Sequence, residues 1–190
     1  MSAVVNAVSL DPVIKKLQQS GFYWGAITGI KAKSLLRDQP VGKFLVRDSS
    51  DSRHLFTITV VTATGITNVR IIFCEGLFSL DKEDTLPRQR SEEFEHRSTS
   101  RFDCVVKMIF YYMLVSRKIL QQNGQATPVE LDETEKAIFL LWSPLYKEVS
   151  SLQHLCRRVL NRQLFTGASY KELSVPHPVK FYLSQYPYPI

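Results

Sequence analysis

The sequence predicts an α+β fold in which antiparallel strands are bracketed by helices and followed by a small helical tail. Three observations indicate this fold. Apolar, strand-like runs between residues 43 and 80 are separated by short turns. Apolar residues recur at helical spacing before these runs and again after residue 100. A further amphipathic stretch begins near residue 151.

Composition narrows the class of protein. With 190 residues, of which 44% are hydrophobic, the chain can bury a core. The net charge is +6, but the basic residues are scattered and form no dense stripe, so we expect no nucleic-acid partner. No apolar run approaches the ~18 residues of a membrane span, so we expect no membrane insertion. The cysteines are odd in number and far apart, which indicates reduced thiols and a cytoplasmic protein.

Two helices are expected before the strands. The first has Asp11 as N-cap, Pro12 at its first position and Gly21 just past its end. Its apolar face carries Val13, Ile14 and Leu17. The second is expected from about Gly29 to Arg37 and is closed by Pro40. Its inward side chains are expected to be Ile30, Ala32, Leu35 and Leu36.

The central feature is a short strand that ends in an arginine. Residues 44–46 form an apolar run, and strand alternation places Arg47 on the face opposite Phe44 and Val46. A planar guanidinium contacts two phosphate oxygens at once, which a lysine ammonium does not. The following loop offers hydroxyl groups from Ser49, Ser50 and Ser52. The stretch predicts an anion site, and phosphotyrosine has the charge and the stem length to reach an arginine at this depth.

The alternative interpretation of Arg47 is an ordinary ion pair with Asp48 or Asp51, which are its near neighbours in sequence. Isolated arginines at strand ends commonly form such pairs, and these pairs are weak.

The next two strands are expected over residues 53–62 and 66–73, with a turn at 63–65. In the second strand, Asn68 and Arg70 share the face opposite its apolar side chains, and both are candidates for the phosphotyrosine site. For Arg70, a solvated charge on an open sheet face is an equal alternative on spacing alone. A short strand at residues 77–80 follows.

The rest of the first domain alternates charged and apolar segments. Residues 81–99 are expected to form a loop or weak hairpin. Ser100 and Asp103 predict a capping box for a helix. The apolar stripe of this helix is interpreted as core and consists of Phe102, Val105, Val106, Ile109, Tyr112 and Met113. Residues 121–135 predict an exposed insertion, and residues 138–142 a closing strand ended by Pro144.

The tail carries one strongly amphipathic helix, which Ser150 or Ser151 is expected to cap. Its apolar stripe consists of Leu152, Leu155, Cys156, Val159 and Leu160. A tail of only 40 residues lies near the lower limit for a chain that must bury its own core. The stripe is therefore expected to lean on another surface, either the first domain or a partner protein.

Two parts of the chain resemble known modules. The residues Tyr23-Trp24-Gly25, Ala32, Leu35-Leu36, Gly42 and Phe44-Leu45-Val46-Arg47 resemble the opening half of a Src-homology-2 (SH2) domain, which binds phosphotyrosine. This resemblance covers roughly residues 21–149. It implies a central antiparallel sheet flanked by two helices, with Arg47 as the phosphate-binding arginine.

The tail resembles a SOCS box, which is a small all-α domain. The pattern Ser-Leu-x-x-x-Cys-x-x-x-Leu, from Ser151 to Leu160, resembles the elongin-binding motif. The cullin-selecting half of a SOCS box has its counterpart in a second segment, which resembles it at Val175, Pro176, His177 and Pro178. Family members usually carry leucine where Val175 stands. The expected division is an extension helix in residues 1–20, an SH2 domain in 21–149 and a SOCS box in 150–190.

This order of modules is similar to that of the suppressor of cytokine signalling (SOCS) family. The resemblance implies a negative regulator of cytokine and JAK-STAT signalling. Such a protein binds tyrosine-phosphorylated cytokine receptors or Janus kinases and recruits elongin B, elongin C and a cullin–RING scaffold of the cullin five type. It thereby acts as the substrate-recognition subunit of a ubiquitin ligase. The alternative is an adaptor that only competes for receptor docking sites.

An enzyme is not expected, because the sequence has no nucleophile elbow, phosphate-binding P-loop or zinc-ligand spacing. No metal or other cofactor is expected either. Some family members inhibit kinases through a segment ahead of the extension helix. The residues before Asp11 do not resemble that segment, so direct kinase inhibition is not expected.

Overall fold

The structure is a computed structural model, and it describes residues 10–81, 100–122, 140–164 and 170–190. The charged loop expected after residue 81 lies outside the described residues, as does most of the polar insertion expected over 121–135. Ile138 and Phe139 of the expected closing strand lie outside them as well. No helix within the described residues has the length and apolar character needed to cross a lipid bilayer.

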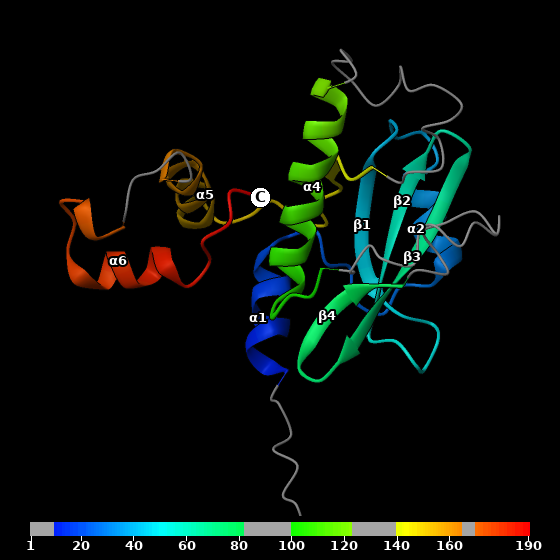
Figure 1. Cartoon of the computed structure of the whole chain (residues 1–190), viewed down its shortest axis with the longest axis horizontal. Coiled ribbons are helices and arrows are strands. Elements are labelled where there is room, and N and C mark those ends of the chain that lie inside the picture. The colour runs from blue at the N-terminus through cyan, green and yellow to red at the C-terminus, as the bar shows by residue number, and fades with distance from the viewer. Residues whose placement is uncertain (1–9, 82–99, 123–139, 165–169) are drawn as a thin grey trace, which may run out of the picture.

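The centre of the fold is a five-stranded sheet with the strand order β4-β3-β2-β1-β5 (Figure 1). Strands β1 to β4 pair as antiparallel neighbours, whereas β5 runs parallel to β1. The strands are β1 Lys43–Asp48, β2 Phe56–Thr62, β3 Gly65–Cys74, β4 Leu77–Leu80 and β5 Ser143–Pro144. The predicted α+β class with its mainly antiparallel sheet is therefore confirmed.

Helices cover both faces of this sheet (Figure 1). The larger core lies under α1 (Asp11–Gln19) and α4 (Val105–Gln122), where the apolar side chains of the sheet meet Leu17 and Ile109. The smaller core lies on the opposite face, under α2 (Gly29–Leu36). It consists of Ala32, Leu36, Leu45 and Val61, with partly buried neighbours. Because strand side chains alternate, Leu45 and Arg47 project to the α2 side while Phe44 and Val46 project to the α4 side.

Several expected boundaries are wrong by a few residues. Leu10 is the N-cap of α1, and Asp11 is its first helical residue. β2 begins at Phe56, so residues 53–55 lie in the preceding turn. Ile30 was expected to face the core but is 84% exposed, because α2 packs on the sheet through Ala32 and Leu36.

The expected capping box before α4 is wrong. The helix begins at Val105, too far from Ser100 for that hydroxyl to cap it. The intervening residue Phe102 pairs instead with Phe78 of β4, and each backbone N–H donates to the other's carbonyl, at 2.9 and 2.6 Å. This pairing draws the segment toward the edge of the sheet and delays the start of the helix. The buried stripe itself is confirmed for Val105, Val106, Ile109 and Met113.

The closing strand is also displaced. Leu140 and Leu141 are buried but belong to no strand, and the pairing with β1 is made by Ser143 and Pro144. Proline lacks an N–H group and is tolerated here because β5 is an edge strand. The parallel pairing is held by hydrogen bonds from Trp142 N to Gly42 O, at 2.8 Å, and from Leu145 N to Phe44 O, at 2.6 Å.

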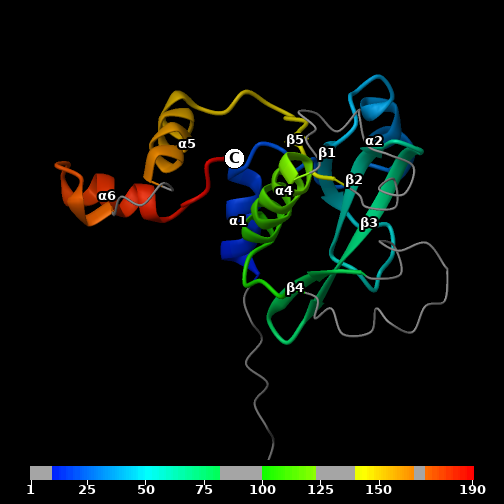
Figure 2. The ribbon, with the colours of Figure 1, turned by 45° about the horizontal axis from the view of Figure 1, so that its top comes forward.

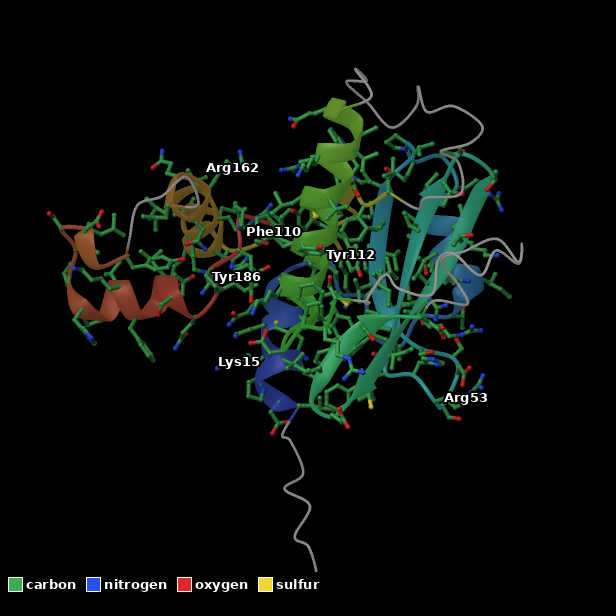
Figure 3. The ribbon with its side chains drawn as sticks, viewed as in Figure 1. Lys15, Arg53, Phe110, Tyr112, Arg162 and Tyr186 are labelled. Atoms are coloured by element: carbon green, nitrogen blue, oxygen red, sulfur yellow. The ribbon has the colours of Figure 1, made fainter. Side chains whose placement is uncertain are left out.

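The tail forms a separate helical layer beside α1 and α4 (Figure 2). It contains α5 (Leu152–Leu164), a short 3-10 turn (Tyr170–Glu172) and α6 (His177–Ser184). After α6 the chain returns to the first domain, where Tyr186, Tyr188 and Ile190 join the larger core. Figure 3 shows Phe110 of α4 and Tyr186 on facing sides of this junction.

Candidate functional site

Arg47 lies at the end of β1 and is only 4% exposed. The sheet register places it opposite Thr57, which in turn stands opposite Arg70 on β3. Neighbouring strands are about 4.8 Å apart, so the backbones at Arg47 and Arg70 are separated by roughly 10 Å. The two arginines thus stand on one face of the sheet with a threonine between them.

Within the described residues, the hydrogen bonds of the Arg47 guanidinium go to neutral acceptors. Its Nε donates to Thr59 Oγ1 at 3.2 Å, and one terminal nitrogen donates to the Asp48 carbonyl at 2.9 Å and to Ser50 Oγ at 3.3 Å. The other terminal nitrogen donates to Asn68 Oδ1 at 3.3 Å. These contacts hold the guanidinium in place without neutralising it, because none of the acceptors is a carboxylate.

The two carboxylates near Arg47, those of Asp48 and Asp51, bind other side chains. Asp48 accepts a hydrogen bond from the Tyr23 hydroxyl, and Asp51 forms an ion pair with Arg53 at 2.8 Å. Burial, followed by the Asp48 contact, raises the pKa of Tyr23. Burial lowers the pKa of Arg47, and the charge of Asp48 opposes that effect. The structure shows neither of the ion pairs considered for Arg47 as an alternative.

A residue that the sequence interpretation missed, Gly29, approaches the guanidinium closely. A β-carbon placed on Gly29 would lie 3.4 Å from an Arg47 terminal nitrogen. Gly29 is the first residue of α2, and the side chain of Thr28 caps that helix by accepting from Lys31 N at 3.2 Å. Arg47 therefore lies beside a helix N-terminus, which itself favours an anion. In the sequence, the signal for this helix N-terminus is Thr28, a capping residue that precedes an apolar segment.

The three serines predicted to bind the phosphate differ in their contacts. Ser50 contacts Arg47 directly, as described above. Ser49 Oγ accepts from Asp51 N at 3.1 Å and so folds the loop on itself. Ser52 is exposed and makes no hydrogen bond to Arg47 in the part of the chain that the structure describes.

The two residues of β3 that were predicted for the phosphotyrosine site also differ in their contacts. Asn68 accepts from Arg47 and, at 2.9 Å, from the Thr59 hydroxyl, so it belongs to the cluster around the guanidinium. The Arg70 side chain is 40% exposed, and its Nε lies 3.7 Å from Asp51 Oδ2. Thr59, which no sequence pattern singled out, connects Arg47 to Asn68.

A second candidate surface is the apolar stripe of α5. Ser151 caps this helix through a 3.3 Å bond from His154 N, as predicted. Leu152 is 76% exposed and Val159 is 56% exposed. The other stripe residues, Leu155, Cys156 and Leu160, are exposed as well. The interpretation in which this stripe packs on the first domain is therefore wrong.

The opposite, polar face of α5 is the buried one. Arg157 is 2% exposed, donates to Tyr182 O at 3.3 Å and to Gln19 Oε1 of α1 at 3.4 Å, and stacks over the rings of Tyr182 and Tyr186. It also donates to His154 Nδ1 at 2.6 Å. Burial and the charges of Arg157 and Arg158 lower the pKa of His154 to about 4.

Asn161, on the same buried face of α5, adds further hydrogen bonds. Its amide donates to the carbonyl groups of Tyr186 and Tyr188, at 2.5 and 3.4 Å, and its side-chain oxygen accepts from the Tyr170 hydroxyl at 3.0 Å. Arginine, histidine and asparagine thus fasten α5 to the first domain and to the C-terminal segment, and this leaves the leucine face outward.

The predicted cullin-selecting residues span the start of α6, with Val175 and Pro176 before the helix and His177 and Pro178 as its first two residues. Val175 is partly buried, whereas Pro176, His177 and Pro178 are exposed, and α6 begins at His177. Beside them, α6 presents Val179 and Phe181, which are 40% and 59% exposed. A groove of about 350 Å³ runs between α5 and α6 and is lined by Cys156, Leu160, Val179 and neighbouring residues.

The two candidate surfaces lie at opposite ends of the molecule. Figure 3 shows Arg53, in the loop that follows β1, on the far side of the sheet from α5. Ligands of the Arg47 cluster and of the α5 stripe would therefore not collide.

Comparison with known proteins places both surfaces in named modules. Residues 22–112 match the family model of the SH2 domain, and residues 148–184 match that of the SOCS box. The chain is 40% identical over 184 residues to "Suppressor of cytokine signaling 3" of Gallus gallus, which covers 93% of this chain and 82% of that protein. It is 36% identical over 210 residues to the Homo sapiens protein of the same name, covering 98% and 85%. Identity to Homo sapiens "Suppressor of cytokine signaling 2" is 35% over 185 residues, covering 97% and 84%.

Proposed function

The chain belongs to the suppressor of cytokine signalling family, and from this premise we propose that it lowers cytokine signalling as the substrate-recognition subunit of a ubiquitin ligase. Its SH2 domain binds phosphotyrosine on activated cytokine receptors or Janus kinases. Its SOCS box recruits elongin B, elongin C and a cullin–RING scaffold of the cullin five type. The chain is non-catalytic, so ubiquitin transfer is carried out by its partners.

One observation supports the ligase role above all others. The apolar stripe of α5 is exposed, although the helix is firmly anchored through its other face. An exposed stripe of leucine and valine beside an apolar groove indicates a protein partner rather than an internal contact. The stripe Leu152, Leu155, Cys156, Val159 and Leu160 is therefore proposed as the elongin-binding surface.

Phosphotyrosine binding is assigned to the Arg47 cluster. The contacts of Arg47 to Ser50 and Asn68 are both 3.3 Å long, whereas charge-assisted contacts to a phosphate are typically about 2.7–2.9 Å. Phosphate oxygens are expected to replace these two long bonds, while Thr59 and the Asp48 carbonyl continue to hold the guanidinium. Ser49, Ser52 and Arg70 lie in the adjoining loop and strand and are proposed as further phosphate or ring contacts.

We also propose boundaries for the three modules and a set of residues that contact the cullin. We place the extension helix in residues 1–20, the SH2 domain in 21–149 and the SOCS box in 150–190. Val175, Pro176, His177 and Pro178 are proposed to select the cullin. A valine at the first of these positions fills less of a pocket than leucine, so cullin binding is expected to be weaker than in family members that carry leucine there.

Co-expression with elongins B and C and cullin five tests this function, with complex formation read by size-exclusion chromatography. The full chain is expected to elute in one stoichiometric complex, and Leu152→Ala is expected to release the elongins because it truncates the most exposed leucine of the stripe. Val149→Ala is the matched control, because Val149 is 93% exposed and precedes the stripe.

A wild-type chain that elutes alone would instead support the second candidate, an adaptor that only competes for receptor docking sites. In that case phosphotyrosine binding would persist without ligase recruitment.

A further inference from the structure

Gly29 differs in its backbone from the other glycines of the described residues. Each of the others has a positive φ, whereas Gly29 is the first helical residue of α2 and has no positive φ. Residues with a side chain adopt a helical backbone readily, and alanine forms helices more readily than glycine does. The backbone of α2 therefore gives no reason for a glycine at this position.

Local packing gives no reason for a glycine either. Within the described residues, a β-carbon on Gly29 would meet Arg47 alone, at 3.4 Å from a terminal nitrogen and 3.9 Å from the central guanidinium carbon. These distances are ordinary van der Waals contacts, so an alanine would fit. What the missing side chain leaves uncovered is the side of the guanidinium that faces α2.

The nitrogen beside Gly29 is one that is expected to meet the ligand. It is Arg47 Nη2, which donates to Asn68 Oδ1 at 3.3 Å, and a phosphate oxygen is expected to replace that long bond. The phosphate oxygen would stand about 2.7–2.9 Å from the nitrogen. A methyl group at 3.4 Å from the same nitrogen would take up space beside that oxygen.

Both elements that border this space are held in place. Arg47 is fixed from the sheet, where its Nε donates to Thr59 Oγ1 at 3.2 Å. The helix α2 is fixed by Ala32 and Leu36, which are fully buried in the smaller core. A side chain added at Gly29 would therefore not be relieved by a shift of either element, and it would take its space from the ligand.

We propose that Gly29 is a specificity-determining residue of the phosphotyrosine site, because its missing side chain leaves the opening beside Arg47 that admits the phosphate group and the ring that carries it. This inference rests on the proposed phosphotyrosine function. Gly29 is itself partly exposed, so a ligand reaches this side of Arg47 from solvent. The phosphate then lies between the bare start of α2 and the Arg47 guanidinium. Side chains of increasing size at this position lower the affinity in steps.

The test measures the affinity of Gly29→Ala and Gly29→Val for N-acetyl-O-phosphotyrosine amide, titrated into the full chain and followed by NMR chemical shifts. Affinity is expected to fall about fivefold in Gly29→Ala, because the added methyl group crowds the phosphate. It is expected to fall about 30-fold in Gly29→Val, whose two further methyl groups are fixed at the β-carbon. A Gly29→Val chain that binds the probe as tightly as wild type would overturn the proposal.

Ser34→Ala and Ser34→Val are the matched controls, because Ser34 is exposed on the same helix and receives identical side chains. Both are expected to bind the probe as wild type does. The urea midpoint of Gly29→Ala is expected to equal or exceed that of wild type, because alanine favours a helix. Its loss of affinity would then occur without a loss of stability. Equal losses of affinity in the Ser34 variants would assign the effect to the helix as a whole and contradict the proposal.

A double variant tests whether the added side chain acts through Arg47. A lysine at position 47 lacks the Nη2 atom that the methyl group would crowd. Gly29→Ala is therefore expected to lower the affinity less in an Arg47→Lys chain than in wild type. An equal loss in the two chains would show that the side chain acts elsewhere, which is the opposite of what we propose.

Failure of this inference and failure of the function are distinguishable. If the probe does not bind to wild type, or if Arg47→Lys binds it as well as wild type does, the phosphotyrosine function itself is wrong. If the probe binds through Arg47 but Gly29→Ala and Gly29→Val match wild type, only the role of Gly29 is wrong.

Discussion

Gly42 and Trp142 approach so closely that a β-carbon on Gly42 would lie 2.6 Å from Trp142 Cβ. Gly42 also has a φ of 83°, a backbone conformation that residues with a side chain rarely adopt. Its carbonyl accepts from Trp142 N at 2.8 Å and so starts the pairing of β5 with β1. This glycine therefore determines where the end of the first domain joins the strand that carries Arg47.

Gly42→Ala is expected to lower the free energy of unfolding by about 2–4 kcal/mol. About 1–2 kcal/mol comes from the left-handed backbone, and the remainder from the clash that pushes the segment at Trp142 away. Urea denaturation measures the loss. Gly25→Ala is the matched control, because Gly25 has a φ of 66° but no atom within 4 Å of its added β-carbon. Equal losses for the two variants would show that the close approach to Trp142 carries no energy.

Arg47→Lys is expected to weaken phosphotyrosine-peptide binding by about 2 kcal/mol, which is roughly 30-fold in affinity. A lysine ammonium lacks the fork that holds Thr59 and the Asp48 carbonyl while two donors face the phosphate. Isothermal titration calorimetry gives the affinity, and circular dichroism checks that the fold is kept. Arg101→Lys serves as control, because Arg101 is exposed and pairs with Glu75 at 3.4 Å. Unchanged affinity in Arg47→Lys would remove Arg47 from the site.

Arg157→Ala is expected to destabilise the junction of the two modules by about 2–3 kcal/mol. The change removes the stacking on Tyr182 and Tyr186 and the contact to Gln19 of α1. Amide hydrogen exchange should show loss of protection in residues 186–190, while the strands keep theirs. Leu152→Ala should leave that protection intact, because Leu152 is 76% exposed. The junction would be held by other contacts if exchange in Arg157→Ala matched wild type.

Stability is expected to fall as the pH is lowered from about 6.5 toward 4 because of His154. Its pKa is lowered to about 4 in the folded chain, mainly by burial, whereas an unfolded histidine titrates near 6.5. Between these values the unfolded state binds more protons than the native state, so the contribution of His154 is complete above pH 6.5 and is lost below it. Urea denaturation at pH 7 and pH 5 should give a difference of about 1–2 kcal/mol.

His154→Gln isolates this contribution, because glutamine does not titrate and its side-chain oxygen can accept from Arg157. The difference between the two pH values is expected to shrink in this variant by the amount that His154 supplies. An identical pH dependence in wild type and His154→Gln would assign the loss to other groups.

Much of the fold followed from local patterns. Alternation placed Phe44 and Val46 on one face and Arg47 on the other, and the structure shows that division. The serine cap and the apolar stripe of α5 were likewise predictable, because the cap joins residues three apart and the stripe repeats over neighbouring turns of one helix. The predictions of the helix start near Phe102 and of the closing strand were wrong for a different reason. Phe102 is held by Phe78 and the segment at Trp142 by Gly42, and both contacts join residues far apart in sequence.

The sequence by itself determined the chemistry of this protein: an arginine at the end of a buried strand, hydroxyl groups after it, and a helix with one apolar stripe. Only the tertiary structure decided what meets these groups. It brought Thr59, Asn68 and Gly29 to Arg47, and it buried Arg157 so that Leu152 faces outward. The physical reason is that periodicity specifies which side chains share a face, whereas the element that covers a face is chosen by packing across the whole chain.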